Sequence, residues 1–164
     1  MRRINRFIRK VPFYYAFAVL SIVVGGYFLL YWLIYHQLLA GKPDIIFVDS
    51  NLYEVFQSYA RYVFALLVVA PLLETLVFQV ALCRLLRLMK WLRERECYIV
   101  LIGGILFGLY HYYSLVHIIV SAIGGALFMY VYLVRRRKGG YWMVVLLHAL
   151  WNGIGLLFEH FGLI

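Results

Sequence analysis

Residues 62–82 read YVFALLVVAPLLETLVFQVAL, an apolar run whose only charged side chain is Glu74. About 20 apolar residues are enough for a helix to cross the hydrocarbon core of a bilayer. A carboxylate near the middle of such a helix costs roughly 3 kcal/mol, and such residues are usually kept for function. The run therefore predicts a transmembrane helix that carries a functional acid.

The rest of the chain has the same character. Its 164 residues are 66% hydrophobic and 14% charged, with a mean hydropathy of +0.88, whereas soluble domains are roughly 45–50% apolar. The sequence thus predicts an all-α, polytopic membrane bundle of about five transmembrane helices. The expected spans are 11–39, 61–82, 98–113, 115–134 and 141–163.

The third span is short, so we expect it either to use its aromatic end to reach full depth or to stop inside the protein. Residues 51–62 mix polar and aromatic side chains, and they predict a helix at the outer interface. We expect residues 1–60 to form an N-terminal transmembrane anchor with an outer loop. Residues 61–164 would form the core domain.

The basic residues orient the bundle. Nearly all of the 16 Lys and Arg residues fall in segments 2–10, 84–95 and 135–138, which a five-span topology places on one side of the membrane. The positive-inside rule makes that side cytoplasmic. We therefore expect a multi-pass integral membrane protein with its N-terminus in the cytoplasm and its C-terminus outside. The opposite loop, 40–58, is mildly acidic.

The net charge of +9 is explained by this topology and by attraction to anionic lipid headgroups. A nucleic-acid-binding protein would need a basic folded face, and the sequence offers none, so nucleic acid is not an expected partner. The lipid bilayer is an expected partner. Cys83 and Cys97 lie near the cytoplasmic edge, where no disulfide is expected. No oligomeric state follows from the sequence.

Four polar side chains are predicted to share one depth in the membrane. At about 1.5 Å per residue, Glu74 and His148 lie roughly 15 Å from the nearest cytoplasmic charges, and His111 and Asn152 lie roughly 20 Å from them. His148 and Asn152 are four residues apart and share a helix face. Phe107 and His111, and Glu74 and Phe78, have the same spacing. Spans two, three and five can therefore bring these groups together.

Neighbouring residues support such a site. Pro71 removes a backbone hydrogen bond three residues before Glu74, and the carbonyl that it frees needs water or a protein partner. Small residues at Gly104 and Gly108, and at positions 121, 124 and 125, predict close helix contacts. His117 lies at a span end, where we expect an interfacial role.

One carboxylate, two imidazoles and an amide suit hydrolysis of a carbonyl compound. Glu74 is a candidate general base, and a histidine would orient the same water. The second histidine and the Asn152 amide could stabilise an oxyanion. No serine or cysteine is placed as a nucleophile at this depth, which favours direct attack by water and needs no cofactor.

Two other types of chemistry use the same residues. Glu74, His111 and His148 could instead hold zinc in a site with two histidines and one carboxylate, although the H-E-x-x-H motif is absent. A buried acid can also relay protons in a transporter. Five spans without an inverted repeat do not favour that alternative.

In order and spacing, these residues resemble the CAAX-protease and bacteriocin-processing family of glutamic-type intramembrane proteases. The family's proline and Glu-Glu-x-x-x-Arg stretch corresponds to Ala70–Gln79, its Phe-x-x-x-His motif to Phe107–His111, and its His-x-x-x-Asn motif to His148–Asn152. The glycine-bearing segment 121–134 fits between the last two motifs. The resemblance covers residues 61–158.

The resemblance implies a peptidase of a bacterial plasma membrane whose site opens toward the cytoplasm. Its substrate would be a membrane-tethered or membrane-entering peptide. By carry-over, Glu74 and His111 would activate water, while His148 and Asn152 would stabilise the oxyanion.

The chain departs from the family pattern at two positions. Thr75 replaces the second family glutamate and Gln79 replaces the arginine. A hydrogen bond between Thr75 and Gln79 could substitute for a buried ion pair, so we expect both residues to support the site. We expect the same of Phe78 and Phe107. The same departure leaves open a catalytically inactive family member that acts as a membrane binding or bacteriocin-immunity protein.

Overall fold

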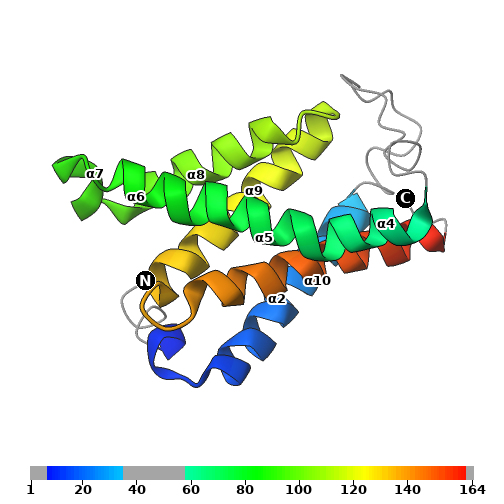
Figure 1. Ribbon diagram of the computed structural model, residues 1–164, viewed down its shortest axis with the longest axis horizontal. Helices are drawn as coiled ribbons and strands as arrows, with labels where there is room; N and C mark the ends of the chain where they lie inside the picture. The colour runs from blue at the N-terminus through cyan, green and yellow to red at the C-terminus, as the bar shows by residue number, and fades with distance from the viewer. Residues whose placement is uncertain (1–6, 35–57, 162–164) are drawn as a thin grey trace.

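The computed structural model describes residues 7–34 and 58–161. Within these ranges every element of regular secondary structure is a helix, which confirms the predicted all-α bundle (Figure 1). The outer loop and the interfacial helix predicted at 51–62 lie mostly outside the described residues.

Within residues 7–34 and 58–161, four helices are long and apolar enough to cross a membrane. They are α2 (Phe13–Ile34), a continuous helix from Tyr59 to Leu86, α9 (Leu115–Arg135) and α10 (Gly140–His160). The third predicted span, 98–113, corresponds to the shorter apolar helix α8 (Glu96–Tyr110). Its 15 residues rise about 22 Å, which is less than the thickness of the hydrocarbon core of a bilayer.

The Tyr59–Leu86 helix, here called the α4–α6 helix, alternates between two geometries. It runs through α4 (Tyr59–Phe64), α5 (Ala70–Glu74) and α6 (Leu82–Leu86), which are separated by π-helical segments at Ala65–Val69 and Thr75–Ala81. π-Helical turns are rare and frequently occur at functional sites. Pro71 and Glu74 both belong to α5, the α-helical turn between the two wide segments.

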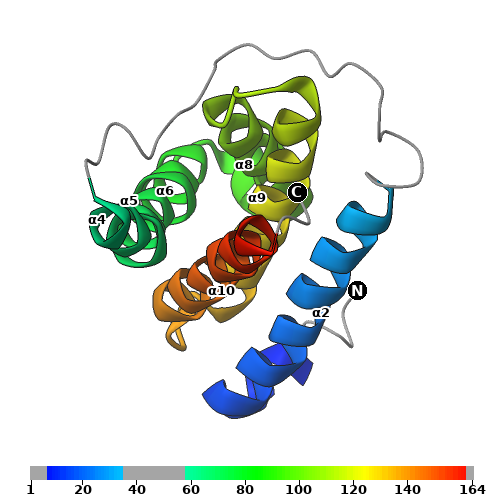
Figure 2. The same ribbon diagram turned by 90° about the vertical axis from the view of Figure 1, so that its right-hand side faces the viewer.

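Helix α10 lies at the centre of the bundle. It contacts α9, α2 and the α4–α6 helix, as the end-on view of Figure 2 shows. Helix α2 joins it through one stripe at every fourth residue, whose members are Ala16, Leu20, Val24 and Phe28. The other faces of α2 remain exposed in the structure, as expected of a helix in contact with lipid.

Helices α8 and α9 form the tightest pair, as the glycine spacing predicted. A Cβ atom at Gly104 would lie 2.6 Å from the carbonyl oxygen of Ala122, and one at Gly108 would lie 2.5 Å from that of Ile118. A Cβ at Gly125 would lie 2.5 Å from Cβ of Phe107. These glycines bring the backbones together and hold Phe107 in place beneath the site.

The basic segments gather at one end of the bundle. Residues 84–95 run from α6 through the short helix α7 (Lys90–Glu94), and residues 135–138 connect α9 to α10. Buried Arg135 donates hydrogen bonds to the carbonyl oxygens of Ile8 and Val11 at 2.7 and 3.2 Å. This contact brings the N-terminal segment to the same end, which we call the basic end.

Candidate active site

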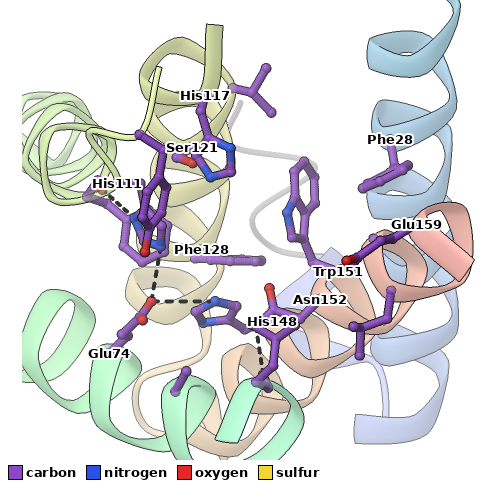
Figure 3. A pocket seen from close by; sticks show the side chains of 18 of the residues that line it. Phe28, Glu74, His111, His117, Ser121, Phe128, His148, Trp151, Asn152 and Glu159 are labelled. Atoms are coloured by element: carbon purple, nitrogen blue, oxygen red, sulfur yellow. Dashed lines mark hydrogen bonds and ion pairs between the residues drawn. The ribbon is translucent and has the colours of Figure 1, made fainter. Parts of the chain in front are cut away.

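Glu74 lies between the two histidines that the sequence grouped with it. Its Oε2 atom is 3.5 Å from Nε2 of His111 and 3.6 Å from Nε2 of His148 (Figure 3). The three side chains come from α5, from the end of α8 and from α10. Both distances exceed that of a direct hydrogen bond, and Oε2 has no hydrogen-bond partner within the described residues. Oε2 of Glu74 is therefore placed to bind one small molecule, such as water, together with the Nε2 atom of either histidine.

His111 occupies a different backbone position from the one predicted. We expected it on a helix face, but α8 ends at Tyr110 and His111 is its C-terminal cap. The backbone N–H of His111 donates to the Gly108 carbonyl, which leaves the Phe107 carbonyl without its helical partner. Nδ1 of the His111 ring lies 2.8 Å from that carbonyl and takes over this role.

This cap fixes the tautomer of the His111 ring. Because a carbonyl oxygen can only accept, Nδ1 must carry the proton. The neutral ring then presents an unprotonated Nε2 toward Glu74, so that both atoms can accept hydrogen bonds from one water molecule. The early end of α8 thus determines which nitrogen of His111 can accept a hydrogen bond in the site.

His148 is held among aromatic rings. It is 3% exposed, and its ring centroid lies 5.1 Å from Phe128 and 5.6 Å from Phe107. Phe107 also lies 4.5 Å from the His111 ring and 5.3 Å from Phe78. Phe78 and Phe107 therefore lie where the sequence expected supporting residues, and Phe107 contacts both imidazoles.

Asn152 follows His148 by one turn, and its Nδ2 donates a 2.8 Å hydrogen bond to the carbonyl oxygen of Leu66. The N–H of Ala70 donates to Ala65, one residue further back than in an α-helix. In this π-helical pattern the Leu66 carbonyl would accept a hydrogen bond from the backbone nitrogen of Pro71, but that nitrogen carries no hydrogen. Asn152 thus satisfies a carbonyl that proline leaves unpaired, and one amide N–H of its side chain remains.

Thr75 and Gln79 do not form the expected hydrogen bond. Both are 0% exposed, yet Oγ1 of Thr75 and both polar atoms of the Gln79 amide have no hydrogen-bond partner in the described part of the chain. The prediction assumed α-helical spacing, in which residues four apart lie above one another. The segment Thr75–Ala81 is π-helical instead, so the α-helical geometry that the prediction assumed does not apply there.

The four proposed catalytic residues line one cavity of about 590 Å³. Sequence reasoning missed several other residues of its wall. Phe128 stacks near His148, His117 stacks on the His111 ring at 6.0 Å, and Trp151 lies 5.1 Å from Tyr27. The interfacial role expected of His117 is compatible with a place at the cavity wall. Periodicity alone could not show which aromatic residues face a cavity and which face lipid.

A comparison with protein families assigns the chain to a family. Residues 56–154 match the family described as type II CAAX prenyl endopeptidase Rce1-like, and this match covers more than half of the chain. The chain belongs to the Rce1-like family. The matched region contains all four proposed catalytic residues, while α2 precedes it. No match was found among curated proteins or among solved structures.

Membership in the Rce1-like family supports a CAAX-type intramembrane endopeptidase at the level of the family. The apolar helices make the chain an integral, multi-pass membrane protein. The roles of individual residues are inferred from the geometry of the site.

Proposed function

We propose that this protein is an intramembrane endopeptidase that hydrolyses a peptide bond of a membrane-associated peptide or protein. The observation that carries the proposal is the position of the Glu74 carboxylate, within 3.6 Å of two imidazole nitrogens in the wall of a large cavity. We further propose that it lies in a bacterial plasma membrane, and that residues 61–164 form the catalytic domain behind an N-terminal anchor.

Water activation is assigned to Glu74 and His111. A water molecule between Oε2 of Glu74 and Nε2 of His111 donates one hydrogen bond to each, which directs a lone pair at the substrate carbonyl. As the water oxygen bonds to the carbonyl carbon, Glu74 accepts the water proton. The tetrahedral intermediate then expels the amine, and Glu74 returns the proton to the departing nitrogen. The products are one new amine and one new carboxylic acid, which keeps the second water proton until it ionises to a carboxylate.

Oxyanion stabilisation is assigned to His148 and Asn152. They lie one turn apart on α10, and both line the cavity. Each can present an N–H group to a developing negative charge: Nε2–H of His148 and the remaining amide N–H of Asn152. Donors held rigidly in a water-poor site are worth about 3–4 kcal/mol of transition-state stabilisation each.

Zinc held by Glu74, His111 and His148 is the alternative chemistry, and it would use the same three side chains. As they stand, the described residues contain no group of three or more His, Cys, Asp or Glu side chains arranged to hold a metal ion. The mechanism above uses the chain's own acid and bases, and none of its steps passes through a metal.

Peptidase activity of the purified protein in detergent, measured on a panel of internally quenched peptides, tests the proposal. Because removal of a general base lowers rates about 10²–10⁴-fold, Glu74→Gln should lose activity to that extent. Glu94→Gln removes the same charge in the short helix α7 of the basic end and should keep full activity. Wild-type cleavage that vanishes with a zinc chelator and returns with Zn²⁺ would replace this mechanism with the metal alternative.

An inactive binding or immunity protein is the second candidate function. The buried and unpartnered side chains of Thr75 and Gln79 favour it, because they stand where the family motif has an ion pair. The two functions differ in their dependence on Glu74. A binding protein would keep its cellular effect in a Glu74→Gln variant that accumulates normally, whereas a peptidase would lose it.

A further inference from the structure

The cavity occupies only one half of the bundle. In the α4–α6 helix its lining residues fall within 62–74, in α9 within 117–128, and in α10 within 148–159. Each of these ranges starts or ends at the layer of the proposed catalytic residues and extends away from the basic end. Helix α2 contributes only Phe28 and Tyr31, in its second half.

A layer of buried side chains closes the cavity toward the basic end. Val144 lies one turn before His148, and it is 0% exposed, as are Leu147 and Met129. Phe128, which lines the cavity, is 1% exposed. Within the described residues, this packed layer therefore separates Glu74 and the cavity from the basic end.

The mouth of the cavity lies at the opposite end. Glu159 lines the cavity in the last turn of α10 and is exposed, and Figure 3 shows it on the far side of the cavity from Glu74. Tyr62 and Tyr113 also line this part of the cavity. Figure 1 shows the same end of the bundle, where α4 begins and α10 finishes.

The positive-inside rule assigns the basic end to the cytoplasm. From these observations we infer that the active site opens on the non-cytoplasmic face of the membrane, and that its substrate is a polypeptide segment presented from that side. The inference rests on the proposed peptidase function. The family resemblance implied an opening toward the cytoplasm. In this structure, such an opening would place the basic loops outside the cell, against the positive-inside rule.

The charge of the cavity restricts the substrate further. Two of its described lining residues are carboxylates, Glu74 and Glu159, and none is Lys or Arg. A free C-terminal carboxylate would therefore meet no cation in this wall. The cavity suits an internal segment of an exported or membrane-anchored chain, neutral or positively charged near the bond that is cut. The aromatic wall, including Phe28, Phe107 and Trp151, provides apolar contact.

Cysteine labelling in intact cells tests the direction of opening without requiring peptidase activity. Cys97 is exposed near the basic end, and Cys83 is buried. A membrane-impermeant maleimide should label Glu159→Cys, made in a Cys97→Ala background, and should label Cys97 of the wild type only after the cells are opened. Labelling of Cys97 in intact cells, with Glu159→Cys protected until lysis, would overturn the inference.

Photo-crosslinking tests the charge preference, again without turnover. Purified full-length protein in detergent is mixed with benzophenone-bearing peptides that differ only in charge and in C-terminal amidation. Amidated cationic peptides should crosslink best. Glu159→Gln should reduce their advantage about two- to fivefold, the effect of one exposed ion pair, whereas Glu94→Gln should leave it unchanged. A preference for free-acid or anionic peptides would contradict the proposed substrate class.

If wild-type protein cleaves no peptide while Glu159→Cys is labelled from outside, the peptidase proposal fails and the direction of opening stands. If it cleaves peptides while the labelling pattern is reversed, the direction of opening fails and the peptidase proposal stands.

Discussion

The hydrogen bond between Asn152 and the Leu66 carbonyl leads to a prediction about coupling between two helices. Ala70 donates to Ala65, and Pro71 has no N–H, so the Leu66 carbonyl depends on Asn152. Replacing Pro71 with alanine supplies the missing donor in the π-helical register. If the segment instead became α-helical, the backbone N–H of Ala70 would donate a hydrogen bond to the Leu66 carbonyl. Either way, Pro71→Ala should make Asn152 dispensable for stability.

The magnitude follows from the single contact. Asn152→Ala removes one hydrogen bond of 2.8 Å and strands a carbonyl within the membrane-spanning region. We expect the free energy of unfolding to fall by about 1–2 kcal/mol, between the usual value for intramembrane side-chain hydrogen bonds and the penalty for an unpaired carbonyl. Because Asn152 lines the cavity, little packing is lost. In the Pro71→Ala background the same change should cost about 0.5 kcal/mol or less.

A double-mutant cycle measures this coupling. The four proteins would be unfolded in mixed micelles of increasing SDS fraction and followed by circular dichroism. The expected interaction energy is about 1 kcal/mol. Additive effects of the two substitutions, within about 0.3 kcal/mol, would refute the idea that Asn152 serves the carbonyl left unpaired by proline.

Two further predictions concern packing and buried polarity. Gly108→Ala should lower the free energy of unfolding by about 1–3 kcal/mol, because the added Cβ would lie 2.5 Å from a backbone oxygen of α9. Gly26→Ala is the control and should be neutral or stabilising, because its Cβ would have nothing within 4 Å. Equal thermal unfolding midpoints of the two variants in detergent would contradict this prediction. Thr75→Val and Gln79→Met remove buried polar atoms that have no partner among the described residues, so each should leave the unfolding free energy unchanged or raise it by up to about 1 kcal/mol. A loss larger than that in SDS unfolding would show that these groups are satisfied in the bilayer.

The helices and the meeting of Glu74 with both histidines could be predicted from the sequence, because apolar length and depth along a helix are local quantities. Counting residues from the cytoplasmic charges placed Glu74 and His148 at one level, and the structure brings their side chains within 3.6 Å. The glycine spacing likewise indicated the close contact between α8 and α9.

The details of the site depend on backbone geometry that the sequence pattern does not reveal. Sequence reasoning placed His111 on a helix face, but α8 ends one residue earlier, and its position as a cap decides which ring nitrogen faces Glu74. It paired Thr75 with Gln79 on α-helical spacing, whereas the segment that carries them is π-helical and neither polar group has a partner within the described residues. The role of the Leu66 carbonyl follows from Pro71 only once the wide register before it is known.

The packing of α2 against α10 has a consequence for biogenesis. During synthesis α2 reaches the membrane before its partner, because α10 follows it in the chain after the α4–α6 helix, α8 and α9. Arg135, which binds the segment before α2, is also translated later than that segment. The newly made α2 must therefore reside in the membrane without α10 at first, which its satisfied backbone and apolar surface allow. The bundle is completed when α10 packs against a helix that was made before the helices lying between them in the chain.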